Sequence, residues 1–584
     1  MATIRGNTQV TLEGKGPLTL RQNDYLATGG EGSVYKVKGM AIKLYTDPDK
    51  MTRDGIPEKI KKLAAFFHPY ISVPQGLVFL SNKPIGFYMP FAEGEPLSRV
   101  FTNDFRTREG FGDRDAVKLV ERMRDVIRFA HDHGAILVDP NEFNWLAYLK
   151  GSDKPEPRII DVDSWVIGRM PPTVAIMPSV RDWHTKGFNQ LSDWFSWGVV
   201  TFQVFTGIHP YKGTLVGFTG LEERMKANAS VFSSGVRLNR AVRDFNCIPV
   251  ALRDWYQEIF QIGKRTIPPS SFEIGVAKAG VTRVVKIITA SGSLVFDKLY
   301  SKTGDEVVRI WPCGVALLKS GELVELRLKR IIGKLNSTNG EVIKTDDGWL
   351  IADWINPVLG HKSEVNGQVA YTYVNESLLQ SESLTLAVKS SYIFRSENRL
   401  FIVTDTGLTE IFFRVIGKAI IAVGQTWSAM VNSTKWFDGV GIQDALGAMY
   451  AIVPFSDKSC AQIRVRELDG LKTVSAKAGN RYVVVIAADK NGEYHKIELV
   501  MRRDYTNYQV SKTVVDGPDL NMALLPKGVG ATIVDDGELI IFVPTSGVVN
   551  KVSDKYITTD IALANWNDNV LYIRKGEVWS VRLK

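Results

Sequence analysis

Three oxygen-bearing side chains follow short apolar runs at a spacing that suits a metal-dependent reaction. Asp139 and Asn144 come after the apolar residues 136–138, and Asp161 comes after residues 159–160. Apolar runs of this length predict buried strands. A carboxylate at a strand end is the ligand type that a hard divalent cation prefers. The pattern therefore predicts that an acid at a strand end points into a cleft that suits a divalent cation.

The two motifs resemble the catalytic loop and the magnesium-binding motif of protein kinases. The first reads Asp-x-x-x-x-Asn, and the second is an apolar-apolar-Asp triplet. The resemblance implies that Asp139 orients a substrate hydroxyl and accepts its proton. It also implies that Asn144 and Asp161 bind the metal, and that Asn144 holds Asp139. ATP and Mg²⁺ are the cofactors that follow from it.

The chain departs from the kinase pattern beside both acids. Leu137 and Val138 replace the usual His-Arg pair, which implies that no activation-loop phosphate is required. Asn141 replaces the usual lysine, so a positive charge near the γ-phosphate is lost. Val162 and Asp163 replace the usual Phe-Gly. Asp163 is either a second acid for metal or phosphate or a cap for the next turn, and we favour the cap.

A glycine-rich turn, residues 27–34, lies upstream between two predicted strands. Such a turn offers its backbone N–H groups to phosphate oxygens. By resemblance, the three kinase glycine positions fall on Ala27, Gly29 and Gly32, so the first is substituted. Val34 would then cover the adenine ring. The alternative is a plain hairpin turn.

The following strand carries a lysine on an apolar face. Alternation over residues 40–44 predicts that Ala41 and Lys43 share one face of the strand. A lysine in such a place needs an anion to offset its desolvation, unless it is an edge lysine that reaches solvent. By resemblance, Lys43 holds the α- and β-phosphates and pairs with Glu58. Glu58 opens a predicted helix over residues 58–67.

Residues 85–94 predict a strand that leads into a linker. Its position resembles the hinge between kinase lobes, which implies a hinge near residues 89–93 where backbone groups, including those of Met89, meet adenine. The Gly-Phe-x-Met-Pro string within this stretch resembles a group of divergent kinase-like proteins of bacterial or phage type. The resemblance implies an α+β bilobal kinase-like fold, with an N-lobe over residues 1–95 and a C-lobe over residues 96–272.

Helical periodicity is strongest in the second of these lobes. An apolar stripe predicts a helix over residues 115–133. Asp193 opens a segment that resembles the kinase helix whose aspartate supports the catalytic loop.

From about residue 276, helical stripes disappear and short apolar strands recur between turns rich in Gly, Asn and Asp. The spacing of ~40–50 residues is typical of propeller blades. Residues 280–584 therefore predict an all-β domain, a β-propeller of six or seven four-stranded blades. A pair of β-sandwiches is the alternative. Hairpin turns are predicted at residues 320–321, 397–398, 405–407, 491–492, 535–537 and 575–576.

The composition is that of a multidomain globular protein, with 584 residues, 45% hydrophobic and 23% charged. A net charge of +9 over this length fits a solvated basic surface, and we expect no specific nucleic-acid partner. Three widely spaced cysteines predict free thiols in a reducing compartment. No signal peptide or bilayer-spanning run is evident, so we expect a cytoplasmic protein without a membrane partner.

These residues favour an ATP- and Mg²⁺-dependent Ser/Thr protein kinase whose β-rich domain recruits a protein substrate or partner. The presence of all four expected polar residues, Lys43, Asp139, Asn144 and Asp161, supports an active enzyme. The altered motifs around them favour a pseudokinase, acting as a nucleotide-binding scaffold or a structural assembly protein. A small-molecule phosphotransferase is the third possibility.

Overall fold

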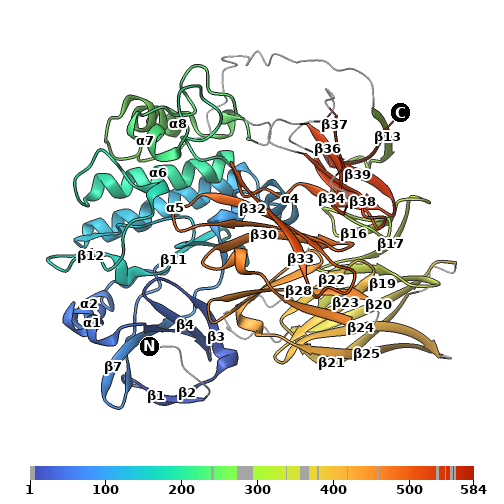
Figure 1. Cartoon of the computed structure of the whole chain (residues 1–584), viewed down its shortest axis with the longest axis horizontal. Coiled ribbons are helices and arrows are strands. Elements are labelled where there is room, and N and C mark those ends of the chain that lie inside the picture. The colour runs from blue at the N-terminus through green and yellow to red at the C-terminus, as the bar shows by residue number, and fades with distance from the viewer. Residues whose placement is uncertain are drawn as a thin grey trace.

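The structure is a computed structural model of the chain. It describes residues 7–238, 242–272, 294–336, 339–355, 367–377, 381–416, 418–456, 459–533, 538–545, 548–552, 557 and 561–583. Described residues up to 272 form a sheet with two short helices and then a mainly helical part, whereas those from 294 onward form antiparallel sheets (Figure 1). The predicted change from helices to an all-β half is confirmed. The predicted boundary at residue 280 lies outside the described residues.

An antiparallel sheet of seven strands forms the first part, in the order β2-β1-β6-β7-β5-β4-β3. Two helices, α1 (Pro48–Arg53) and α2 (Ile56–Leu63), connect its middle strands. The strands are β1 (Thr8–Leu12), β2 (Gly16–Leu20), β3 (Tyr25–Thr28), β4 (Gly32–Val37), β5 (Met40–Tyr45), β6 (Gly76–Leu80) and β7 (Lys83–Pro90).

Strand β5 separates two hydrophobic cores. Ile42 and Leu44 pack into the core on the outer face of the sheet. Ala41 and Tyr45 pack into the larger core that the sheet shares with the helical part. Lys43 has the same parity as Ala41 and Tyr45, so alternation along the strand places its side chain between the two parts. The prediction that Ala41 and Lys43 share a face is confirmed.

Two long helices form the centre of the helical part. Helix α5 (Asp113–Asp132) buries one apolar stripe, which confirms the helix predicted there. Helix α6 (Gln190–Thr206) is buried along most of its length. Shorter elements surround them: α3 (Leu97–Val100), α4 (Asn103–Glu109), α7 (Leu221–Lys226), α8 (Val250–Gln257), η1 (Gln22–Asp24), η2 (Val162–Ser164), η3 (Pro178–Val180), η4 (Phe245–Cys247) and η5 (Glu258–Ile262).

Two small sheets hold the predicted motifs together. Strand β10 (Trp145–Tyr148) pairs with β11 (Glu156–Ile159) and with β8 (Glu95–Pro96). Strand β9 (Ala135–Ile136) pairs with β12 (Val166–Ile167). The loop from β9 to β10 carries the first motif, and the loop from β11 to β12 carries the second. Because the strands that flank the two loops are paired, the loops lie side by side.

Seven four-stranded antiparallel sheets form the rest of the chain. Six of them take four strands that are consecutive in the sequence. They are β14 (Val307–Trp311), β15 (Val315–Leu318), β16 (Glu322–Glu325) and β17 (Arg330–Lys334); β18 (Glu341–Lys344), β19 (Gly348–Ile355), β20 (Gly367–Asn375) and β21 (Ser381–Ser390); β22 (Tyr392–Ser396), β23 (Arg399–Thr404), β24 (Gly407–Ile416) and β25 (Lys418–Ser428); β26 (Thr434–Phe437), β27 (Val440–Ala445), β28 (Ala448–Ser456) and β29 (Ser459–Arg464); β30 (Lys472–Gly479), β31 (Tyr482–Ala488), β32 (Tyr494–Met501) and β33 (Tyr508–Val515); β34 (Met522–Leu524), β35 (Gly530–Ile533), β36 (Leu539–Val543) and β37 (Val548–Val552).

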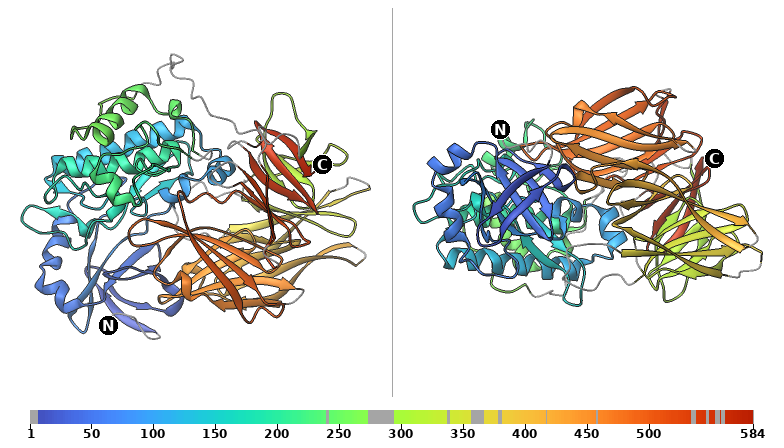
Figure 2. Two further views of the ribbon diagram at one scale, coloured as in Figure 1. Left: turned by 45° about the horizontal axis from the view of Figure 1, so that its top comes forward. Right: turned by 90° about the horizontal axis from the view of Figure 1, so that it is seen from below.

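The seventh sheet joins distant strands, in the order β13-β40-β39-β38. Strand β13 (Leu294–Tyr300) pairs along β40 (Glu577–Leu583), and β38 (Ala562–Trp566) and β39 (Asn569–Arg574) complete the sheet. The lining of one cavity of about 200 Å³ includes residues of α3, α4 and strands from six sheets, namely β14, β18, β22, β26, β30 and β38. Each of these strands comes first in its sheet in chain order, except that β13 precedes β38. Figure 2 shows this β-rich half beside the N-terminal half in two further views.

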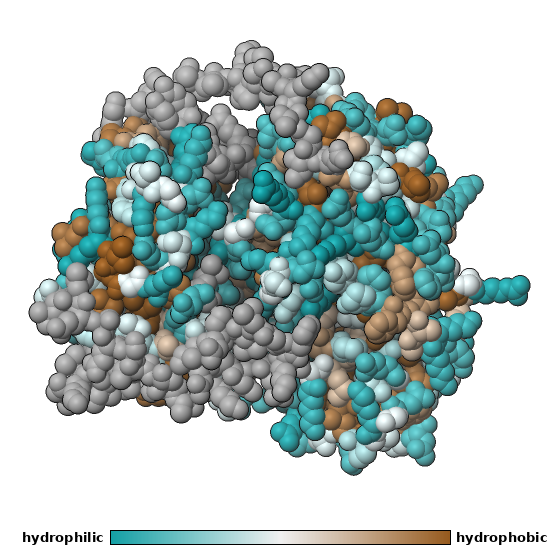
Figure 3. Space-filling view, turned by 180° about the vertical axis from the view of Figure 1, so that it is seen from behind, coloured by the Kyte–Doolittle hydropathy of each residue, from teal (hydrophilic) through white to brown (hydrophobic). Residues whose placement is uncertain are grey.

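The predicted hairpins at residues 320–321, 397–398, 405–407, 491–492 and 575–576 are confirmed by the strand pairing around each turn. Strands β35 and β36 also pair, although the turn predicted at residues 535–537 lies outside the described residues. On the face drawn in Figure 3, hydrophobic residues are scattered among hydrophilic ones. Within the described ranges, no helix combines the length and apolarity needed to cross a bilayer.

Packing between sheets predicts the effect of a core truncation. Leu571 of β39 is fully buried and packs with residues of β14, β15 and β16 from the neighbouring sheet. We expect Leu571→Ala to lower the free energy of unfolding by about 2–5 kcal/mol, because the cavity it leaves cannot close. Chemical denaturation measures this. Val510→Ala, at an exposed position of β33, is the control and should change stability by under about 0.5 kcal/mol.

Candidate active site

The ammonium group of Lys43 lies among three carboxylates. Its Nζ is 2.8 Å from Asp163 Oδ2, and 3.2 Å from both Asp161 Oδ1 and Glu31 Oε2. The Lys43 side chain is only 6% exposed. Burial lowers the pKa of Lys43, but the nearby negative groups outweigh it and hold the pKa well above its usual value. Lys43 is therefore a charged group that joins β5, the glycine-rich turn and the loop after β11.

The predicted pair between Lys43 and Glu58 is not formed, and this prediction was wrong. Glu58 is exposed on α2. The apolar stripe of α2 fixes the rotation of the helix, and this rotation buries Lys59 instead. The Lys59 Nζ donates to the carbonyl oxygen of Pro171 at 2.9 Å, and burial lowers its pKa to about 8.

Asp163 is the deeply buried partner of Lys43. Its Oδ2 accepts hydrogen bonds from Lys43 and from the hydroxyl of Tyr45. The turn-capping role that we favoured for Asp163 is not observed. Ser164 closes the turn instead, because its Oγ donates to the carbonyl oxygen of Asp161 at 2.8 Å. Asp163 thus pairs with Lys43 in place of Glu58, the helix residue predicted for this role.

Asp139 is fixed by hydrogen bonds to both carboxylate oxygens. Oδ1 accepts from the Met177 amide at 3.1 Å, and Oδ2 accepts from Asn141 Nδ2 at 2.9 Å. Burial raises the pKa of Asp139, and the charge on Asp161 adds to this, although these hydrogen bonds and Lys472 oppose the shift. A carboxylate with a raised pKa is better suited to accept a proton near neutral pH than an exposed aspartate.

Asp193 holds the loop that carries Asp139. Its two carboxylate oxygens accept from the amides of Leu137 at 2.8 Å and Val138 at 3.0 Å, and His131 Nε2 lies 2.8 Å away. The supporting role predicted for Asp193 is therefore confirmed. Val138 has a φ of 71° and Asp161 a φ of 59°. A β-branched residue in this left-handed region is strained, and such strain is typical of functional loops.

Asn144 and Asp161 offer the oxygens that would suit a magnesium ion. Asn144 Nδ2 donates to the carbonyl oxygen of Asp139 at 2.9 Å, which holds Asp139 as predicted. This orientation leaves Asn144 Oδ1 without a hydrogen-bond donor among the described residues. The Asp161 carboxylate is 45% exposed, and Lys43 lowers its pKa. An ionised carboxylate and an amide oxygen are hard donors that fit Mg²⁺.

The glycine-rich turn contains one glycine that packing strictly requires. A Cβ at Gly32 would lie 2.1 Å from the carbonyl oxygen of Leu44, whereas a Cβ at Gly29 would meet nothing closer than the carbonyl oxygen of Gly32 at 4.0 Å. Ala27 and Val34 face each other across β3 and β4. The turn is therefore a tight hairpin whose Glu31 side chain reaches Lys43.

The residues predicted to surround adenine lie on neighbouring strands of one sheet. Val34 of β4 is opposite Lys43 of β5, and Ala41 of β5 is opposite Met89 of β7. Val34, Ala41 and Met89 all pack into the core between the sheet and the helical part. Strand pairing thus places Ala27, Gly32, Val34, Ala41 and Met89 on β3, β4, β5 and β7, with Gly29 in the turn between β3 and β4, whereas Glu58 is exposed on α2.

The β-rich half contacts the loop between Asp139 and Asn144, which the sequence analysis did not anticipate. Phe143 packs with residues of β30, β31 and β32. The hydroxyl of Tyr494 lies 3.3 Å from Glu142 Oε1, and Lys472 Nζ lies 4.5 Å from the centroid of the Phe143 ring. Phe143 is the aromatic residue between Glu142 and Asn144, and nothing in this local sequence indicates which part of the chain it packs against.

The hairpin of β31 and β32 packs on the segment that follows Asp161. The Asn491 carbonyl oxygen accepts from the Ser179 amide at 3.2 Å. Gly492 has a φ of 82°, and a Cβ there would lie 2.1 Å from Ser179 Oγ. Both the backbone conformation and the close approach therefore require glycine at the tip of this hairpin.

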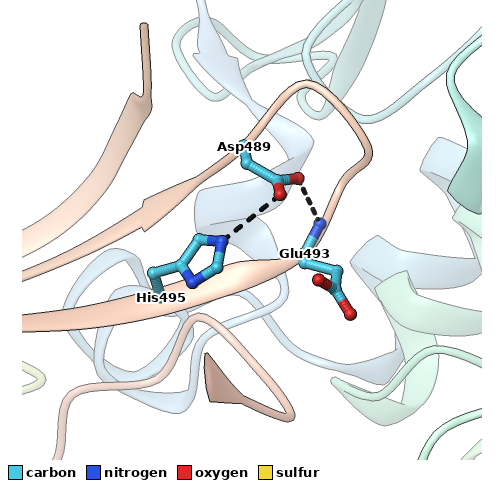
Figure 4. Close-up of side chains that lie close together, drawn as sticks. All are labelled: Asp489, Glu493 and His495. Carbon is cyan, nitrogen blue, oxygen red and sulfur yellow. Dashed lines mark hydrogen bonds and ion pairs between the residues drawn. The ribbon is translucent and has the colours of Figure 1, made fainter. Parts of the chain in front are cut away.

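The side chain of Asp489 organises the turn at the tip of this hairpin, next to Glu493 and His495 (Figure 4). Asp489 Oδ1 accepts from the amides of Asn491 and Glu493, and Oδ2 lies 3.3 Å from His495 Nε2. Partial burial raises the pKa of Asp489, but these hydrogen bonds outweigh it and lower the pKa. The Glu493 carboxylate points away from Asp489 in Figure 4. The arrangement fits turn stabilisation better than metal binding.

No protein-family model matches the chain, and no curated protein is similar to it in sequence.

Loss of the deepest carboxylate should destabilise the N-terminal half. We expect Asp163→Asn to lower the free energy of unfolding by about 3 kcal/mol, because it leaves buried Lys43 with weaker compensation. Chemical denaturation measures the change. Glu58→Gln, at the exposed position once expected to pair with Lys43, is the control and should alter stability by less than about 0.5 kcal/mol. An unchanged midpoint for Asp163→Asn would contradict the buried ion pair.

His209 should make stability depend on pH. Its Nε2 lies 2.8 Å from the Ser179 carbonyl oxygen, and its Nδ1 accepts from the Tyr211 amide. These partners fix a neutral tautomer, and burial lowers the pKa of His209 from 6.5 to about 3. The unfolded chain therefore binds an extra proton as pH falls below about 6.5, and stability decreases by about 1.4 kcal/mol per pH unit.

His209→Gln tests this pH dependence by removing the proton-binding group. Between pH 6.5 and 5, the variant should lose about 2 kcal/mol less stability than the wild type. Denaturation midpoints at the two pH values give the difference. His133→Gln, at an exposed helix end, should keep the wild-type pH dependence. Equal losses in His209→Gln and the wild type would show that His209 is not held neutral.

Proposed function

We propose that residues 7–272 have a kinase-like bilobal fold and that the chain is an ATP- and Mg²⁺-dependent protein kinase acting on Ser or Thr hydroxyls. The observation that carries this proposal is the ion pair between Lys43 and Asp161, 3.2 Å apart, next to a loop in which Asn144 and Asp193 hold Asp139. A strand lysine, a metal-type acid and a base from three separate segments are the minimal set for phosphoryl transfer.

ATP would bind between the sheet and the helical part. The backbone of the glycine-rich turn and Lys43 would hold its phosphates, and Val34, Ala41 and Met89 would contact the adenine. Asn144 and Asp161 would hold Mg²⁺, which neutralises charge on the phosphates. Glu31 and Asp163 keep Lys43 charged and in place. Glu31 would have to give way to a phosphate oxygen, because both need the same ammonium.

The proposed reaction moves one phosphoryl group between two oxygens. A bond forms between the substrate hydroxyl oxygen and the γ-phosphorus, and the bond from that phosphorus to the bridging oxygen of ADP breaks. The hydroxyl proton passes to the Asp139 carboxylate, which later releases it to water. The raised pKa of Asp139 suits this role, and activity should fall as pH decreases through that pKa.

A nucleotide-binding pseudokinase is the second candidate, and one observation favours it. Both carboxylate oxygens of Asp139 already accept hydrogen bonds, from Met177 and Asn141. A substrate hydroxyl would have to share or displace the Met177 amide. In that case the chain would bind ATP as a scaffold without transferring phosphate.

We also propose that the seven sheets of the β-rich half form a closed seven-bladed propeller that recruits a protein substrate or partner. The pairing of β13 with β40 supports closure, because it builds one sheet from both ends of this half. The cavity lined by the first strands of six sheets fits a central axis. A cytoplasmic location is part of the proposal, and it is consistent with three free cysteines.

The test of the kinase proposal is transfer from γ-labelled ATP. With Mg²⁺ and a mixture of generic protein substrates, we expect label on Ser or Thr, including on the chain itself. Asp139→Asn should reduce transfer by at least about 10²-fold, because it removes the proton acceptor. Asp132→Asn, at an exposed helix end, is the matched control and should transfer at the wild-type rate.

Other outcomes separate the remaining candidates. ATP binding without transfer by the wild type would favour the pseudokinase. Label found only on a small molecule would favour a small-molecule phosphotransferase. Equal transfer by Asp139→Asn and the wild type would remove Asp139 from the proposed mechanism.

A further inference from the structure

We propose that Lys472, from the β-rich half, is a further residue of the nucleotide site and contacts the γ-phosphate of ATP. This inference rests on the proposed function, since it assumes a nucleotide at Lys43 and Asp161. It extends that function by giving the β-rich half a direct part in phosphoryl transfer, beyond recruiting a partner.

The position of Lys472 is fixed by the contact between the two halves. Lys472 is the first residue of β30, and its Nζ lies 4.5 Å from the centroid of the Phe143 ring. Phe143 belongs to the loop between Asp139 and Asn144. The same ring packs with residues of β30, β31 and β32, and Tyr494 of β32 reaches Glu142. The base of the Lys472 side chain is therefore anchored beside the loop that carries the proposed base.

The Lys472 ammonium is not neutralised by the protein around it. The residue is exposed, and within the described ranges no carboxylate lies within ion-pair distance of its Nζ. An ammonium over an aromatic face gains some cation–π stabilisation and keeps its remaining N–H donors for another acceptor. The geometry therefore places this ammonium beside the loop that carries Asp139 and Asn144.

The catalytic loop itself lacks such a charge. Asn141 lies two positions after Asp139, and its neutral side chain is hydrogen-bonded through both its nitrogen and its oxygen. Its Nδ2 donates to Asp139, and its Oδ1 accepts from the amides of Phe143 and Asn144. Lys43 is shared among three carboxylates. A phosphoryl group placed between Asp139 and Asp161 would therefore find Lys472 as a cation without a carboxylate partner.

The chemistry of phosphoryl transfer explains what Lys472 would do. Negative charge on the transferred group must be balanced while the bond to the hydroxyl oxygen forms and the bond to ADP breaks. An ammonium on a flexible stem serves as a compact charge that can follow the phosphate oxygens. Lys472 would only donate hydrogen bonds and stay protonated throughout, because the hydroxyl proton goes to Asp139. The bonds formed and broken in the proposed transfer are therefore the same with Lys472 as without it.

The test compares Lys472→Met with the wild type in the full chain, using two measurements. The first is the preference for ATP over ADP in calorimetric binding with Mg²⁺. We expect the ratio of ATP affinity to ADP affinity to be about tenfold lower in the variant, because ADP lacks the γ-phosphate that Lys472 contacts. The second is the rate of transfer from labelled ATP, which should fall by about 10–10³-fold. Lys472→Arg should recover part of both.

Matched variants and outcomes make the test decisive. Lys512→Met changes an exposed lysine on the outer strand of the same sheet and should behave as the wild type. Unfolding temperatures equal to that of the wild type would show that both methionine variants remain folded. Wild-type ATP preference and transfer rate in a folded Lys472→Met would overturn the role of Lys472 and leave the kinase proposal standing. Absence of nucleotide binding by the wild type would overturn the proposed function and this inference together.

Discussion

The burial of the Lys43 ammonium group constrains the arrangement of the segments around it in the N-terminal half. An isolated charge removed from water costs several kcal/mol, so Lys43 can be buried only while carboxylates surround it. Three segments supply them: the glycine-rich turn, the loop after β11 and the 3₁₀ turn that follows. The same charges that stabilise Lys43 also draw these segments together. The way the loop after β11 and the glycine-rich turn meet at β5 is therefore an electrostatic consequence of where β5 places a single lysine.

The contact between the two halves places β30 and the β31–β32 hairpin against the loop that carries Asp139 and against η3. Phe143 and Glu142 meet one side of this sheet, and Ser179 meets the hairpin tip. Glu142 and Phe143 lie between Asp139 and Asn144, and Ser179 lies two residues after Met177, whose amide donates to Asp139. Movement of the β-rich half would therefore change the surroundings of Asp139 and of the segment after Asp161 together. Under the proposed function, substrate recruitment and the geometry of the reaction share one interface.

Sequence patterns predicted the elements well where local physics decides them. Alternation along β5 placed Ala41 and Lys43 on one face, and the stripe of α5 and most hairpin turns follow from periodicity and turn residues. The same patterns could not choose among acids near Lys43, because Glu58, Asp163 and Glu31 differ only in how tertiary packing rotates or buries them. The contact of Lys472 with Phe143 joins positions 329 residues apart, and no local signal encodes it.

The sheet built from β13 and β40 has a consequence for how the β-rich half is made. Lys298 and Glu577 are ion-paired across it, although 279 positions separate them. The residues of all six intervening sheets must be synthesised before this pairing can form. Non-local strand pairing of this kind slows folding, because a long stretch of chain must be brought together first. The N-terminal half is synthesised earlier and does not depend on this pairing. It can therefore fold while the β-rich half is still being synthesised.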